Sequence, residues 1–352
     1  MSAALRILEP GLLTTVQDLG RIGYQHLGVP TSGALDPVSL RAANVLVGND
    51  PIEGALEIAY VGPTFAVEAD SVNLACAGAN ASVEVLPDEA AVSGVRYSSM
   101  QSLRAHRGQV VRIGPTSGSS VVYLAVEGGF DIEPVLGSVS TYLRGAIGGW
   151  QGRALIAGDA LPLRRRSGSD RDEFRLEGLD LARPSRFRVV LGPQHACFSE
   201  RSIKAFLEGE YTVSPATDRM ATLLEGPKLQ HIAGHDIVSD AIALGSIQVP
   251  GHGRPIVLMA DRQTTGGYPK VATVISADLP ALGRVRIGDK ISFEETSVEQ
   301  AQQLRRTLLR QIDAIANRLV PAHRTREELA AGLLTNNLIS GIVNAQLAPS
   351  VE

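Results

Sequence analysis

The sequence predicts a mainly β protein, formed by two related modules and a helical tail. Short β-branched or alternating runs, nearly all bounded by Gly or Pro, fill the first 296 residues and are typical of antiparallel barrels or sandwiches. Several motifs recur in the same order in two parts of the chain, which indicates a duplication. Residues 297–352 carry helix-capping patterns instead.

Composition limits the class of protein. The 352 residues are 44% hydrophobic, which is enough for a large core, and the formal net charge is only −4. No run of Lys or Arg interleaved with aromatics favours nucleic-acid binding. Neither a leader-like start nor an apolar stretch of roughly 20 residues is found, so we expect a cytoplasmic protein without a membrane span. Cys76 and Cys197 are expected to be reduced structural thiols.

The duplication rests on three pairs of motifs. Residues 32–36 (SGALD) are echoed by 214–218 (SPATD), and the Leu-Glu of 56–57 before Gly-Pro is echoed at 224–227. A Gly-Arg pair followed by Gly-Asp and a short apolar run occurs at 152–163 and again at 283–293. The shared order predicts a first module over residues 1–182, a second over 183–296 and the tail over 297–352.

The elements follow from local signals. Strands are predicted at 72–77, 121–126, 187–191, 256–260 and 287–293. Asp36 and Pro37 open a helix that Gly48 closes, and another helix should begin after Ser199. In the tail, a capping box at 297–300 opens a helix to about Leu319, before Pro321, and residues 325–328 repeat the device. The apolar segment 333–343 needs a partner surface, either on its own chain or in a homo-oligomer.

The segment from Asp261 to Pro269 is the first candidate site. It directly follows the apolar run 256–260 and presents an acid, a base, an amide and two hydroxyls before the glycine pair 266–267, which would let the chain turn back. A polar hairpin turn is the simpler alternative. We favour a binding site, because five hydrogen-bonding side chains in a row exceed what one turn requires.

Common catalytic signatures are absent from the sequence. There is no Walker A loop, no Gly-x-Gly-x-x-Gly, no His-Glu-x-x-His and no Gly-x-Ser-x-Gly. His231 and His235 are four residues apart, but nearby glycines disfavour a helix there, so no metal site is predicted. No Met-Lys dipeptide exists, so any biotin involved would be carried by another protein.

Longer motifs resemble the allophanate hydrolase subunit 2 family, also called the biotin-dependent carboxyltransferase family. The resemblance covers roughly residues 5–295, and members include subunits of 5-oxoprolinase and of urea-carboxylating enzymes. It is carried by the motifs at 10–21 (PGLLTTVQDLGR), 26–30 (HLGVP), 32–36, 44–49 (NVLVGN), 137–153, 234–240 (GHDIVSD) and 263–269.

The resemblance implies two tandem cyclophilin-like β-barrel modules and half of an enzyme. The expected partner is a subunit 1-type cyclophilin-like protein, with a lactam-opening third subunit in 5-oxoprolinase. The expected reaction converts 5-oxo-L-proline, ATP and water to L-glutamate, ADP and phosphate, with ATP shared with the partner. Two alternatives remain: a carboxyltransferase half acting on urea or a related amide, or a regulator that binds a kinase-inhibitor-like partner.

Both chemistries develop charge on an amide-like oxygen and handle anions, so Arg, His and amide donors at strand ends are the expected site residues. The arginines would hold phosphate or carboxylate, the histidines would donate or relay a proton, and the amides would orient the substrate. The predicted catalytic residues are His26, Asp261 and His235. The predicted substrate-binding residues are Asp18, Arg21, Asp36, Arg219, Gln248, Gln263, Thr264 and Tyr268.

The chain departs from the family pattern at two places. Family members commonly read Asp-Arg-Met-Gly with an arginine two residues further on, where this chain reads 218–223 (DRMATL). They often read Gly-Ser-Arg-Ser where this chain has Gly137-Ser138-Val139-Ser140. Two positive charges are therefore missing, and either a different ligand or a loss of activity would follow if those arginines touch an anion.

Overall fold

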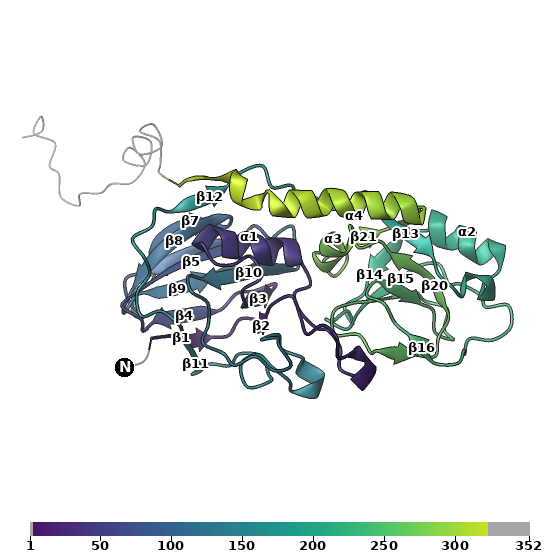
Figure 1. Ribbon diagram of the computed structural model, residues 1–352, viewed down its shortest axis with the longest axis horizontal. Coiled ribbons are helices and arrows are strands. Elements are labelled where there is room, and N and C mark those ends of the chain that lie inside the picture. The colour runs from purple at the N-terminus through teal and green to yellow at the C-terminus, as the bar shows by residue number, and fades with distance from the viewer. Residues whose placement is uncertain (1–2, 323–352) are drawn as a thin grey trace, which may run out of the picture.

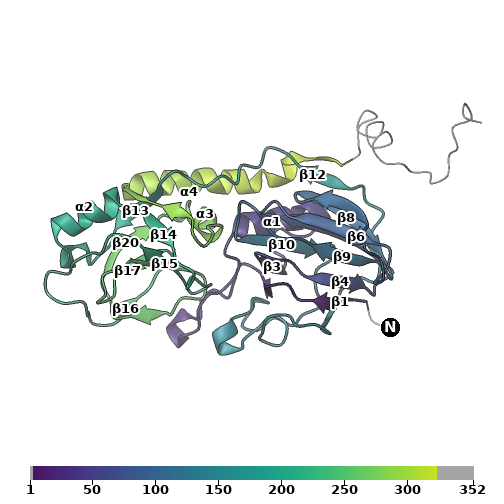
Figure 2. The ribbon, with the colours of Figure 1, turned by 180° about the vertical axis from the view of Figure 1, so that it is seen from behind.

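The computed structural model describes residues 3–322. It is mainly β, as predicted, and its two halves lie side by side beneath one long helix (Figure 1). Figure 2 shows the same arrangement from behind, with α4 along one edge of both halves. The predictions for residues 325–328 and 333–343 lie outside the described residues. No described helix is both long and apolar enough to cross a membrane.

The N-terminal half contains two antiparallel sheets that enclose one apolar core. The first sheet has the order β11 (Ala160–Pro162), β1 (Ala4–Glu9), β4 (Thr64–Val67), β9 (Val110–Ile113), β6 (Ser82–Leu86) and β7 (Val95–Ser98). The second has the order β2 (Leu13–Gln17), β3 (Ala55–Ala59), β10 (Val121–Val126), β5 (Ser71–Ala77), β8 (Gln101–His106), β12 (Phe174–Leu176) and β23 (Leu319–Pro321). Buried side chains of both sheets, such as Leu5, Phe65 and Leu124, share one hydrophobic cluster.

The C-terminal half is a sheet that nearly closes on itself. Its order is β21 (Lys290–Ile291), β14 (Tyr211–Val213), β15 (Ala221–Glu225), β18 (Ile256–Leu258), β17 (Ser246–Gln248), β20 (Lys270–Val274), β13 (Phe187–Leu191) and β22 (Phe293–Glu295). The two edge strands β21 and β22 are separated by a single residue, which brings the edges together. β16 (Asp240–Ala241) and β19 (Thr265–Gly266) form a separate ribbon.

The predicted helix caps are confirmed. Asp36 accepts hydrogen bonds from the backbone N–H groups of Val38 and Ser39 at the start of α1 (Pro37–Val47), and Gly48 ends that helix with φ of 76°. Ser199 caps α2 (Glu200–Glu208), and Ser297 with Gln300 forms the capping box of α4 (Val298–Asp313). α3 (Leu279–Gly283) and four 3₁₀ turns, η1 (Gln25–Leu27), η2 (Leu143–Gly145), η3 (His195–Cys197) and η4 (Ile315–Arg318), complete the helical elements of residues 3–322.

Three local predictions are wrong in extent. α4 ends at Asp313 rather than near Leu319, and β23 then pairs with β12 of the N-terminal half. The predicted strand 287–293 is two short strands on either side of Ser292, and the first begins only at Lys290, because a turn closed by the Arg286 N–H and the Asp289 carboxylate precedes β21. The glycine pair is not a tight turn: Gly266 lies in β19, where a Cβ would lie 2.6 Å from the Ile242 Cδ1.

Candidate functional site

A cleft of about 390 Å³ lies between the two halves, and we call it the junction cleft. Its walls are largely apolar, but four charged side chains line it among the described residues: Arg144, Asp218, Arg219 and Asp261. A concave apolar pocket with a few converging polar groups is the usual form of a small-molecule site. A more open groove of about 550 Å³ along α2 has no such buried charges, and we place the candidate site in the junction cleft.

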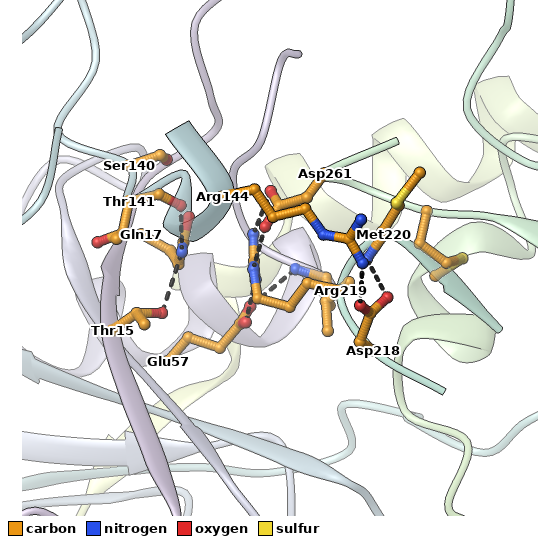
Figure 3. Close-up of polar contacts among 12 residues, drawn as sticks. Thr15, Gln17, Glu57, Ser140, Thr141, Arg144, Asp218, Arg219, Met220 and Asp261 are labelled. Atoms are coloured by element: carbon orange, nitrogen blue, oxygen red, sulfur yellow. Dashed lines mark hydrogen bonds and ion pairs between the residues drawn. The ribbon is translucent and has the colours of Figure 1, made fainter. Parts of the chain in front are cut away.

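The floor of the cleft holds a buried ion-pair cluster. Arg219 is 6% exposed and lies between Glu57 of β3 and Asp261, which are 4% exposed each (Figure 3). Its Nε donates to Asp261 Oδ2 at 3.0 Å, and its Nη1 donates to Glu57 Oε1. Burial opposes the charge of Arg219, yet the carboxylates of Glu57 and Asp261 raise its pKa above the usual value. The three side chains therefore form a buried ion-pair triad.

This triad continues into a network that joins the two halves. Tyr123 of β10 donates its hydroxyl proton to Glu57 and accepts a hydrogen bond from the Asp36 N–H at 2.9 Å. Arg284 of the C-terminal half donates to Asp36 at 2.7 Å. Burial, followed by the Glu57 charge, raises the pKa of Tyr123, so this phenol remains a donor. Long-range hydrogen bonds with all partners buried fix the relative position of the halves at the cleft floor.

The mouth of the cleft is bridged by a surface ion pair. Arg144 of η2 donates to Asp218 at 3.0 Å, and both side chains are about half exposed, at 59% and 48% (Figure 3). Exposed pairs of this kind contribute little to stability. The charges at the mouth and the charges on the floor therefore line one and the same cavity.

Arg21 lies in the loop beyond β2 and is almost fully buried, at 1% exposure. Its Nη2 donates to the Ser140 carbonyl, while its Nε and Nη1 are buried without a hydrogen-bond partner among the described residues. Burial lowers its pKa, and the charges of Asp18 and Asp261 oppose that shift. Buried guanidinium donors without partners are unusual, and an anionic group is the partner that would satisfy them best.

Gln17 and Asp18 organise the same region. Gln17 donates to Thr15 at 3.0 Å and to the Thr141 carbonyl at 3.1 Å, and its Oε1 has no partner among the described residues (Figure 3). Asp18 accepts hydrogen bonds from the Gly20 N–H and from the Ser138 and Ser140 hydroxyls. Asp18 thus holds the Arg21 loop against residues 138–140.

The segment after Asp261 forms a chain of amides rather than one compact pocket. Gln263 Nε2 donates to Gln248 Oε1 at 3.3 Å, and Gln248 Nε2 donates to the Tyr268 carbonyl at 3.3 Å. The Gln263 Oε1 is buried and unpaired among the described residues. The Thr264 carbonyl accepts a hydrogen bond from the Ile242 N–H, and the Tyr268 side chain is 40% exposed.

The predicted site residues are only partly brought together. Arg219 and Asp261 share the cleft floor, and Asp36 is linked to Glu57 of the same cluster by two hydrogen bonds, through the Tyr123 hydroxyl. His26 is exposed on η1, and His235 has half of its side chain exposed beside Asp236 at 3.6 Å. Neither histidine lines the junction cleft, and of the other predicted site residues only Arg219 and Asp261 line it.

Sequence reasoning missed Glu57, Tyr123, Arg144 and Arg284 as site residues. The available signal was a lone acid within an apolar strand, Ala55–Ala59, and a lone tyrosine within Val121–Val126. A polar group inside a buried strand requires a partner, which is the physical reason to look for one. The partner could not be named, because Glu57 and Arg219 are 162 residues apart.

Residues 27–295 match a family model described as the carboxyltransferase domain, subdomain A and B. The match spans more than half of the chain, so this protein belongs to that carboxyltransferase family. The expected family resemblance is confirmed.

Within the family, the chain is similar to the C subunit of 5-oxoprolinase from Escherichia coli, at 38% identity over 90% of this chain and 98% of that protein. The corresponding 5-oxoprolinase protein of Haemophilus influenzae is 37% identical over 85% of this chain and 94% of its own length. The urea amidolyase of Saccharomyces cerevisiae is 29% identical, and this chain covers only 19% of it. The structure of the Kluyveromyces lactis urea carboxylase superposes with a TM-score of 0.80 at 26% identity, over 92% of this chain and 31% of that one.

Proposed function

We propose that this chain is the C subunit of an ATP-dependent 5-oxoprolinase, which converts 5-oxo-L-proline, ATP and water to L-glutamate, ADP and phosphate. The main support is the match to two bacterial proteins of that name over nearly their whole length, at 37–38% identity. The form of the junction cleft also supports it, because a concave and largely apolar pocket of about 390 Å³ accepts a small cyclic amide.

The proposed catalyst is a complex rather than the chain alone. A subunit 1-type partner would complete the site and share ATP with it, and a third subunit would open the lactam. His26 and His235 are exposed, so they would donate or relay a proton at a surface that the partner subunit covers. Biotin, if used at all, would be attached to another protein.

Specific roles follow from which donors are free. Arg219 already donates four of its five N–H groups to Asp261, Glu57 and the Gly33 carbonyl. We therefore propose that Arg219 and Asp36 shape the cleft, that Asp261 sets its charge, and that Arg21 supplies donors to an anionic group. Gln248, Gln263, Thr264 and Tyr268 would orient the amide, and Asp18 would position Arg21.

The two halves are proposed to be related modules of cyclophilin type, with boundaries at 1–182 and 183–296. One pair of hydrogen bonds supports this duplication. In the N-terminal half the Gly158 N–H donates to the Ile7 carbonyl and the Ile7 N–H donates to the Asp159 carbonyl. In the C-terminal half Gly288, Val213 and Asp289 repeat both bonds in the same positions.

A carboxyltransferase half that acts on urea is the second candidate, favoured by the similarity to urea amidolyase. One reconstitution separates the candidates. The chain is co-purified with its candidate partner proteins, and ATP hydrolysis is measured with 5-oxo-L-proline or with urea as the added substrate. We expect hydrolysis dependent on 5-oxo-L-proline from the complex and none from the chain alone. Substantial turnover by the chain alone, or dependence on urea and carboxybiotin, would contradict the proposal.

Gln263→Ala tests the proposed amide subsite in that complex. Loss of a hydrogen bond that orients the substrate should lower kcat/KM roughly 10- to 1,000-fold. Gln302→Ala on the exposed face of α4 is the matched control and should leave kcat/KM unchanged. If Gln263→Ala lowers the melting temperature strongly but keeps activity per folded molecule, the amide chain is structural.

A further inference from the structure

A second cavity of about 230 Å³ lies at the junction of the two halves, and we call it the arginine cavity. It borders the junction cleft, because Leu35 and Met259 line both. Residues from the start of α1, from α3 and from α4 close it, and Figure 1 shows α4 passing over this junction. The charged residues that line it are two arginines, Arg262 and Arg305.

Arg262 is a buried cation that lacks an acidic partner. Its side chain is 5% exposed, and it donates from Nε to the Ile242 carbonyl at 3.2 Å and from Nη1 to the Met259 carbonyl at 3.4 Å. Within residues 3–322 its Nη2 has no hydrogen bond and no carboxylate lies within ion-pair distance. Burial lowers the pKa of Arg262. A buried, unpaired charge is costly, so a counter-ion from outside the chain would be bound favourably.

Arg305 adds a second free charge from α4. It is half-buried, lines the cavity and makes no ion pair with any described residue. Its charge is felt by Arg41 of α1, whose pKa is lowered first by burial and then by Arg305, against the opposing charge of Asp313. Arg41 itself donates to the Pro37 carbonyl at 3.0 Å. Arg305 therefore adds an unpaired positive charge to the lining of the arginine cavity.

Hydroxyl groups complete the lining. Thr31, Ser32 and Ser276 border the cavity, and the Ser32 Oγ is buried without a partner among the described residues. Ser32 has φ of 54°, an unfavourable conformation that is held by a hydrogen bond from its N–H to the Ala260 carbonyl at 3.1 Å. No carboxylate of the described chain lines this cavity. Guanidinium and hydroxyl donors without acceptors are the chemistry that binds oxyanions.

We propose that the arginine cavity binds a phosphate-type oxyanion, held by Arg262 and Arg305 and by the Ser32 hydroxyl. A dianion with several oxygens matches two guanidinium groups and a hydroxyl better than a singly charged carboxylate does. The site is separate from the ion-pair triad, since Asp261 contacts Arg219 in the junction cleft while its neighbour Arg262 contributes to the arginine cavity. This inference does not rest on the proposed function, because it uses only the charges and donors of the chain.

Isothermal titration of the full chain with inorganic phosphate at low ionic strength tests the proposal. We expect binding of one phosphate per chain, accompanied by a higher melting temperature. Arg262→Gln and Arg305→Gln should each weaken binding roughly 10- to 100-fold. Arg306→Gln changes the next residue of α4, which is exposed and does not line the cavity, and should leave the affinity as it is.

The outcome is decisive even if Arg262→Gln folds poorly, because Arg305 is only half-buried and its replacement should be tolerated. Equal effects of Arg305→Gln and Arg306→Gln would overturn the proposal, as would the absence of phosphate binding. A parallel titration with L-glutamate at matched ionic strength distinguishes the anions. Glutamate binding as tight as phosphate binding would overturn the phosphate assignment.

Discussion

Replacing Asp261 by Asn removes one of the two carboxylates that hold Arg219 at the floor of the junction cleft. Asp261 accepts hydrogen bonds from Arg219 at 3.0 and 3.2 Å, and both side chains are buried. Because Asp261 is only 4% exposed, this substitution should cost more stability than the same change at a solvent-facing position. An asparagine keeps one acceptor, so the loss is about one charge-assisted hydrogen bond together with part of the ion-pair energy, roughly 2–3 kcal/mol.

The measurement is the melting temperature of the purified variant. At about 2 °C or slightly less per kcal/mol for a chain of this length, the expected decrease is roughly 3–6 °C. Asp218→Asn is the matched control, because it makes the same change in the same cleft but breaks an exposed pair with Arg144. The melting temperature of Asp218→Asn should decrease by less than about 1 °C. A decrease of the same size in both variants, or none in Asp261→Asn, would refute the stabilising role of the buried ion-pair triad.

Three further outcomes are expected. Iodoacetamide at mildly alkaline pH should label the half-buried Cys197 in the native protein and Cys76 only after unfolding, because burial raises the pKa of Cys76 to about 12; equal native labelling would contradict this. A chain that ends at residue 314 should melt below one that ends at residue 322, because it lacks β23 and the buried Ile315; equal melting would show that neither contributes. Hydrogen bonds from Arg153 lower the pKa of Asp159 in the folded protein. A carboxylate whose pKa is lower in the folded than in the unfolded state stabilises the fold at pH values above its unfolded-state pKa. This stabilisation is lost as the pH falls through the folded-state pKa. The difference in unfolding free energy between the wild type and Arg153→Gln should therefore be largest near neutral pH and decrease below about pH 4. A difference that does not depend on pH would contradict this role of Arg153.

The sequence alone determined the parts of this protein that depend on neighbouring residues. The Asp36 cap and Gly48 end of α1 and the capping box of Ser297 and Gln300 were predicted correctly, because each signal acts over a few residues. Apolar runs such as Val121–Val126 likewise identified buried strands. Such local signals did not predict where α4 ends, since β23 is stabilised by pairing with the distant β12.

Only the tertiary structure decided which polar groups meet. The sequence motif at Asp261 and Arg262 was recognised, yet its two charged side chains line different cavities. Asp261 pairs with Arg219 in the junction cleft, while Arg262 has unpaired donors in the arginine cavity, which Arg305 also lines. Glu57 is brought to Arg219 by the packing of one half against the other. Contacts between residues so far apart in the chain depend on the global path of the backbone, which short-range propensities do not encode.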